Sequence, residues 1–156
     1  MKRKEAAEYQ ANYPEDYAEE VAEGFHREPE GEWPAVAPSS PELTVNVDVL
    51  TGQPLEHVYI ATLPTKNGWE VPAYLAGGGW NENPGPEVHV AALKSWNDRY
   101  GAELVGISGD CMNIRVTRLP SGRDEAMALA REQYAYCEDI VSQGVDTISN
   151  LAASLS

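Results

Sequence analysis

Alternating apolar and polar side chains predict three strands in the first half of the chain. Residues 43–49 place an apolar side chain at every second position, which is the period of a strand with one buried face. Residues 57–63 follow a turn and predict a second strand, and residues 69–75 predict a third. Because proline has no amide donor, Pro72 predicts that the third strand lies at a sheet edge.

The spacing changes to three and four residues in the second half, which predicts helices. Residues 87–100 predict a helix with a buried stripe, and Gly101 is a good residue to end it. The stripe consists of His89, Leu93, Trp96 and Tyr100. Two strands over 102–107 and 112–118 then predict a hairpin around the turn that ends at Asp110.

A second long helix is predicted from a cap at Ser121 to Gly144, followed by a last helix capped by Asp146 or Thr147. The predicted buried face of the helix that begins at Ser121 contains Ala126, Leu129, Ala130, Gln133 and Cys137. The fold class that we expect is α+β, with an antiparallel sheet and two or three helices packed on one face.

The first 42 residues differ from the rest in pattern and in charge. Residues 5–23 suit a helix that Pro14 breaks into two pieces, and four prolines follow between positions 29 and 41. We therefore expect an acidic N-terminal helical arm with a Pro-rich linker over residues 1–42, and a single α+β domain over 43–156.

The net charge of −14 narrows the classes of partner. Residues 1–42 alone hold 4 basic and 11 acidic side chains, a net −7. A phosphate backbone would be repelled, so we expect no direct contact with nucleic acid. No apolar run is long enough to span a bilayer, and no apolar segment follows the basic residues at the start, so we expect a cytoplasmic protein without a membrane role.

Several short motifs follow one another between Gly77 and Leu155. They are Gly77-Gly-Gly-Trp80-Asn81, the helix with His89 and Trp96, Tyr100-Gly-Ala-Glu103, Tyr134-Ala-Tyr136-Cys137, Asp139 and Gln143-Gly144. Together they resemble the bacterial and phage family catalogued as domain of unknown function 4253. The resemblance implies one fold unit over about residues 77–155 and implies no established activity. Glu138 departs from it, since a proline is common there, and many members continue past the position of Ser156 into an aromatic-rich strand.

A catalytic hypothesis starts from Cys137, His89 and Asp139, with Asp110 as the other candidate carboxylate. A thiol needs a nearby imidazole to become a thiolate at neutral pH, and a carboxylate can orient that imidazole. The alternative is that Cys137 is a small apolar residue on a buried helix face. The three histidines and two cysteines do not lie at paired ligand spacing, so we expect no metal and no cofactor.

Binding candidates form two groups. Trp80, Asn81, Gln133 and Gln143 are the first, because a glutamine on an apolar helix face needs a hydrogen-bond partner. That partner is either the Trp80-Asn81 loop or a ligand. The second group is acidic and consists of Glu15, Asp16, Glu19, Glu20 and Glu23. It is either a solvated helix face or a surface that imitates phosphates to a basic partner.

Our leading hypothesis from sequence is a small acidic binding protein rather than an enzyme. It would be a phage or mobile-element inhibitor that occupies a basic surface of a host or defence protein. One alternative is an enzyme or small-ligand binder that uses the region of Trp80, His89 and Cys137. Another is an oligomeric structural or virion-accessory protein. A pocket that joins His89 to Cys137 would favour the enzyme or ligand binder.

Overall fold

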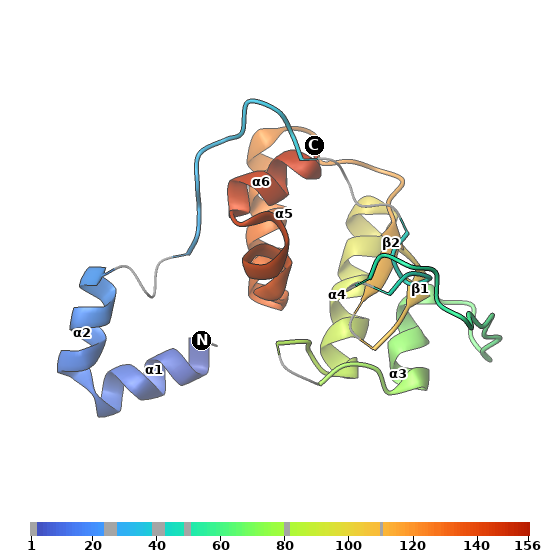
Figure 1. Cartoon of the computed structure of the whole chain (residues 1–156), viewed down its shortest axis with the longest axis horizontal. Coiled ribbons are helices and arrows are strands. Elements are labelled where there is room, and N and C mark those ends of the chain that lie inside the picture. Colours follow the sequence, from blue (N-terminus) through green and yellow to red (C-terminus); the bar gives the residue numbers. More distant parts are fainter. Residues whose placement is uncertain (1–2, 24–27, 39–42, 49–50, 80–81, 110) are drawn as a thin grey trace. The chain divides into compact units, whose positions relative to one another are not determined.

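The computed structural model describes residues 3–23, 28–38, 43–48, 51–79, 82–109 and 111–156. The chain divides into two compact units, Met1–Glu30 and Gly31–Ser156. Helices and a two-stranded antiparallel sheet make up the regular structure of the described residues (Figure 1). The predicted α+β class is therefore confirmed.

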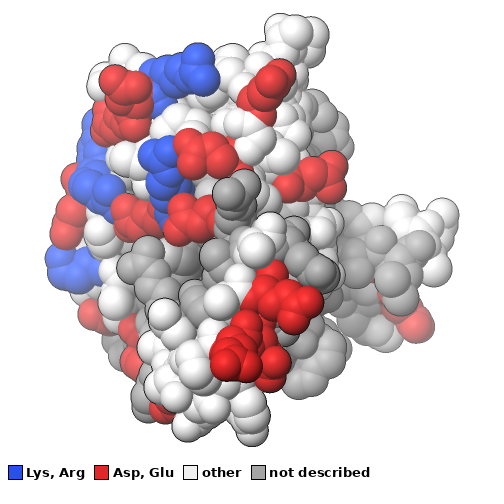
Figure 2. Space-filling model, turned by 90° about the vertical axis from the view of Figure 1, so that its left-hand side faces the viewer, with Lys and Arg blue, Asp and Glu red and all other residues white. Residues whose placement is uncertain are grey.

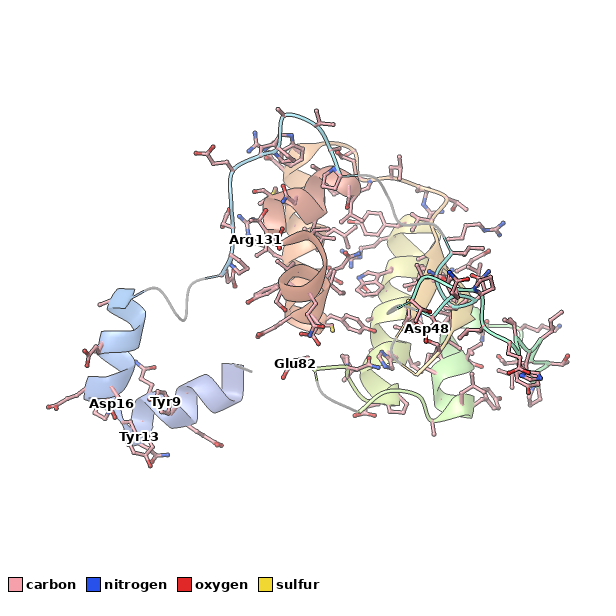
Figure 3. All side chains as sticks on the ribbon, viewed as in Figure 1. Tyr9, Tyr13, Asp16, Asp48, Glu82 and Arg131 are labelled. Atoms are coloured by element: carbon pink, nitrogen blue, oxygen red, sulfur yellow. The ribbon has the colours of Figure 1, made fainter. Side chains whose placement is uncertain are left out.

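The N-terminal unit contains two helices, α1 (Arg3–Asn12) and α2 (Pro14–Glu23). Pro14 divides them as predicted, because it lacks the amide donor that a helix interior needs but fits a first turn. The ring centres of Tyr9 and Tyr13 are 5.4 Å apart. Figure 3 labels both residues, near the join of the two helices.

The larger unit is built partly on α4 (Pro86–Tyr100), which packs against α3 (Val71–Leu75) and the hairpin of β1 (Glu103–Ile107) and β2 (Met112–Arg115) (Figure 1). The predicted stripe of α4 is buried along its whole length. Gly101 ends the helix in the left-handed conformation, with φ of 61°. The Arg118 guanidinium then donates hydrogen bonds to the last carbonyls of α4, those of residues 97–99.

Two further helices, α5 (Arg123–Tyr136) and α6 (Ile148–Ser154), lie side by side (Figure 1). Ala126, Ala130, Ile148 and Ala152 are fully buried between them. The Thr147 side chain caps α6 by accepting a hydrogen bond from the Asn150 amide at 3.1 Å. Of the two caps predicted from sequence, Asp146 and Thr147, the structure uses Thr147.

The end of α5 differs from the prediction. The helix stops at Tyr136 rather than near Gly144, and a π-helical turn, Val141–Val145, follows. Cys137 is the first residue beyond α5 and has an extended backbone, with φ of −154°. It therefore does not share the buried helix face with Ala126 and Ala130, and that prediction was wrong.

The predicted strand over residues 43–49 is not formed by its described part. A single bridge joins Val47 to Pro54. The Asn113 side chain of β2 accepts hydrogen bonds from the amides of Thr44 and Val45 at 2.8 and 2.9 Å. Because a side chain takes these two amides, the segment docks on the hairpin as a turn and does not extend the sheet.

The other two predicted strands are also absent from the described residues. Residues 57–63 have no regular structure, and Val58, Tyr59 and Ile60 are exposed, Ile60 to 99%. Alternation predicts a strand only where a partner covers one face, and none does so here. Residues 68–75 are helical, because Pro72 lies in the first turn of α3, where its missing amide costs nothing.

The larger unit begins before residue 43, at Gly31. Trp33 packs against the cluster between α5 and α6, and the Arg123 guanidinium lies 4.5 Å from the centre of the Trp33 ring. The Ser149 hydroxyl donates a hydrogen bond of 3.0 Å to the Gly31 carbonyl. Part of the Pro-rich segment thus belongs to the folded unit.

Candidate functional site

A cavity of about 360 Å³ lies where α4, the β1–β2 hairpin and the end of α5 meet. This volume is in the range of small-molecule sites. His89 and Trp96 face it from α4, and Gln133 and Tyr136 from α5. Cys137 also lines it, so the structure brings His89 and Cys137 to one pocket.

A hydrogen bond joins the buried His89 to Tyr136 at the pocket. The Nδ1 atom of His89 lies 2.6 Å from the Tyr136 hydroxyl, and the His89 residue is 1% exposed. Their ring centres are 5.7 Å apart. The hydroxyl either donates to a neutral imidazole or accepts from its Nδ1–H, so the pair can present a donor or an acceptor to its surroundings.

The glycine-rich loop closes over His89. An added Cβ at Gly78 would come within 2.3 Å of the His89 Nε2 atom and 2.0 Å of the Pro84 carbonyl oxygen. The φ angle of Gly78 is +93°, which side chains rarely adopt. His89 and the Pro84 carbonyl therefore leave no room for a side chain at Gly78. Trp80 and Asn81 lie outside the described residues.

Burial favours the uncharged forms of three side chains of the pocket, those of His89, Tyr136 and Cys137. Burial lowers the pKa of the His89 imidazole, and the Glu87 carboxylate opposes this shift. Burial raises the pKa of the Tyr136 phenol and that of the Cys137 thiol. The amides of Asp139 and Ile140 hydrogen-bond the Cys137 sulfur and lower its pKa, but burial outweighs them.

The predicted arrangement of Cys137, His89 and Asp139 is only partly brought together. His89 Nδ1 is bonded to Tyr136, so that atom has a phenol rather than a carboxylate beside it. The Asp139 carboxylate accepts a hydrogen bond from the Ser142 hydroxyl at 3.3 Å. An orienting carboxylate on His89 is thus not supplied by Asp139, and the Cys137 sulfur is protonated at neutral pH because its pKa is raised.

Trp96 and Tyr136 form an aromatic wall of the pocket, and a hydrogen bond to Glu132 fixes the Trp96 ring. The rings of Trp96 and Tyr136 meet edge to face, with centres 5.1 Å apart and planes at 72°. The Trp96 Nε1–H donates to the Glu132 carboxylate at 2.9 Å, and Arg99 donates to both oxygens of that carboxylate at 2.5 and 2.7 Å. Glu132 was missed from sequence, because nothing in its spacing marks it as a partner of α4.

Another part of the lining comes from the hairpin and its turn and was also missed from sequence. Ile107, Met112 and Ile114 line the cavity, as does Cys111 from the turn. The Cys111 sulfur lies 3.0 Å from the Thr44 hydroxyl. Alternation marked the hairpin strands, but it did not show that their inner face would meet α4 and the end of α5.

The remaining sequence candidates are not among the described residues that line the pocket. Gln143 is exposed, and it follows α5 in the π-helical turn. Glu15, Asp16 and Glu19 are exposed on α2, and Figure 3 labels Asp16 there. The acids Glu20 and Glu23 belong to the same helix. That these acids imitate phosphates stays a prediction.

The charged side chains and the possible metal ligands of the described residues do not mark a metal site. On the face in Figure 2, acidic side chains lie both beside Lys and Arg and apart from them. No group of three or more His, Cys, Asp or Glu in the described part is placed to hold a metal ion. Within the same residues, no helix has the length and apolar character needed to cross a membrane.

Comparison with known proteins identifies the family but no activity. Neither the curated proteins nor the solved structures gave a match. A family model described as Domain of unknown function (DUF4253) matches residues 59–156. The match covers the helices and the hairpin that form the pocket, and it begins before the segment in which the motifs were recognised. The chain therefore belongs to the DUF4253 family.

Proposed function

We propose that the domain is a binding module for a small uncharged organic molecule, held in the cavity beside His89 and Tyr136. The observation that carries this proposal is the cavity itself, in which five polar side chains from α4, α5 and two loops lie among apolar and aromatic side chains. Apolar walls with a few converging polar groups are the usual form of a ligand site. The five polar side chains of this cavity are those of Asn83, His89, Ser108, Gln133 and Tyr136.

The chemistry of the lining supports an uncharged ligand. None of the described lining residues is Asp, Glu, Lys or Arg. The pKa shifts of His89 and Tyr136 both favour the neutral side chains. A charged ligand would lose its hydration without gaining an ion pair in this lining, which is costly.

Binding is favoured over covalent catalysis by the state of Cys137. Its raised pKa keeps the sulfur protonated, whereas a nucleophilic cysteine needs a lowered pKa. We expect iodoacetamide to alkylate native Cys137 at pH 7 at least about tenfold more slowly than the same residue in the unfolded chain. Fast native alkylation that His89→Ala abolishes would instead establish an activated thiolate and an enzyme.

A pocket-filling variant tests the binding proposal. Ile107→Trp places a large ring in the cavity from β1, and Val105→Trp on the same strand is its control, because Val105 is 51% exposed and does not line the cavity. The probes are indole, benzamide and 2-pyridone, three uncharged rings. Binding is measured by saturation-transfer NMR on wild type and both variants.

We expect wild type and Val105→Trp to bind at least one probe, and Ile107→Trp to lose that binding by about tenfold or more while remaining folded. Equal binding by all three proteins would place the rings elsewhere and reject the proposal. A wild-type chain that binds none of the three rings would reject it as well.

A further inference from the structure

Gln133 is the polar group of the pocket whose hydrogen-bonding capacity is least used. Its backbone carbonyl accepts from the Cys137 amide at 2.9 Å. Its side-chain amide makes no hydrogen bond to another residue in the part of the chain that the structure describes, although it is half-buried and lines the cavity. Among the described residues no side-chain polar atom is both fully buried and unpaired, so the Gln133 amide is open to the cavity. A ligand in the cavity can therefore supply its hydrogen bonds.

The geometry of an amide defines what such a ligand must offer. A glutamine side chain presents one acceptor and two donors in a plane, with the carbonyl oxygen next to the NH₂ group. The complementary group is a ring edge with a donor beside an acceptor, because both hydrogen bonds then form in one plane. Glutamine reads an adenine edge in this bidentate way.

The walls beside Gln133 favour a flat ring. Trp96 and Tyr136 line the cavity, and their edge-to-face contact fixes both rings. Aromatic faces stack on other aromatic rings with little dependence on ring substituents. Burial is the main cause of the raised pKa of the Cys137 thiol, and the nearby carboxylates of Asp139 and Glu82 add to it. Their negative charge also disfavours an anion at this end of the pocket.

We infer that the pocket recognises a planar, uncharged ring with an amide-like edge, such as a lactam or a nucleobase, through the side chain of Gln133. This inference rests on the proposed binding function and names the class of ligand. The His89–Tyr136 pair lines the same cavity and offers one further hydrogen bond as either donor or acceptor.

Four ring compounds of similar size test whether the donor–acceptor edge, rather than the ring itself, determines binding. The probe is 2-pyridone, which has N–H beside C=O. In 1-methyl-2-pyridone a methyl group replaces the donor, benzoate is an anion at pH 7, and toluene has no polar edge. Dissociation constants are measured by NMR titration on wild type, Gln133→Leu and Gln133→Met, with thermal unfolding as the check that each variant is folded.

We expect wild type to bind 2-pyridone about tenfold or more tightly than each of the other three rings, because each of them leaves at least the Gln133 carbonyl oxygen without a donor. Both variants should bind 2-pyridone and its methyl derivative equally. Equal affinity of wild type for 2-pyridone and toluene, or a preference for benzoate, would overturn the inferred class and leave the pocket function standing. Undiminished 2-pyridone binding by the variants would overturn the role of Gln133, and absence of binding by every ring would overturn both proposals.

Discussion

Replacement of Trp96 by alanine is the sharpest test of how the pocket wall is held. Trp96 is 5% exposed and belongs to the cluster that joins α4, α5 and the hairpin. Removing a buried tryptophan to alanine costs about 3–5 kcal/mol through lost transfer free energy and the cavity left behind. The edge-to-face contact with Tyr136 contributes about 0.5–1.5 kcal/mol of the interaction that is lost.

The hydrogen bond to Glu132 adds less, because that carboxylate is partly exposed and keeps its pairing with Arg99. We therefore expect Trp96→Ala to lower the free energy of unfolding by about 4 kcal/mol. Trp96→Phe is the control, since it keeps an aromatic ring at this place and removes the indole donor. It should cost only about 1–2 kcal/mol.

Urea unfolding followed by far-ultraviolet circular dichroism measures both values without relying on the tryptophan that is changed. A loss of roughly 4 kcal/mol is a large share of the stability of a small domain. An alanine variant within about 1 kcal/mol of wild type would refute the reasoning, because no cavity of the expected size could then have formed. Equal losses for alanine and phenylalanine would show that the donor, and not the packing, matters.

Three further predictions concern the glycine loop, the N-terminal boundary and His89. Gly78→Ala should unfold or strongly destabilise the loop, whereas Gly79→Ala, with φ of +79° but open space around it, should cost only about 1–2 kcal/mol by thermal unfolding. A chain that begins at Gly31 should keep the stability of the domain, and one that begins at Leu43 should lose about 1–3 kcal/mol because it lacks the partly buried Trp33. Burial lowers the pKa of His89 below that of the unfolded chain. The neutral imidazole therefore stabilises the fold above about pH 6.5, and this stabilisation is lost as pH falls through the folded pKa. Wild type should lose more free energy of unfolding between pH 7 and pH 5 than His89→Gln.

The second half of the fold was largely predictable, because its elements are marked by local signals. The α4 stripe needs only the helical period, Gly101 needs only its left-handed conformation, and the hairpin needs two short apolar runs around a turn. Each of these signals lies within the element that it predicts, and the structure confirms them.

The first half was mispredicted where the outcome depends on distant partners. Alternation over residues 43–49 and 57–63 is real, but whether a strand forms depends on what lies beside it. The amides of Thr44 and Val45 go to a side chain 68 or 69 positions away in the sequence. No local pattern shows that competition, so tertiary contacts overrode β propensity.

The site was predictable in part for the same reason. His89 and Cys137 were chosen from sequence, and the structure places both at one cavity. The bond from His89 to Tyr136 was not predicted, because it joins two helices 47 positions apart. Asp139 was chosen from its closeness to Cys137 in sequence, but its carboxylate turns to Ser142.

The most direct test of the central claim, that the cavity beside His89 is a ligand site, is a crystal structure of the full chain soaked with 2-pyridone. We predict that the ring lies between the hairpin and the wall of Trp96 and Tyr136, with its N–H and C=O paired to the Gln133 amide. A ring bound elsewhere on the chain, with this cavity empty at a concentration that saturates binding in solution, would contradict the account.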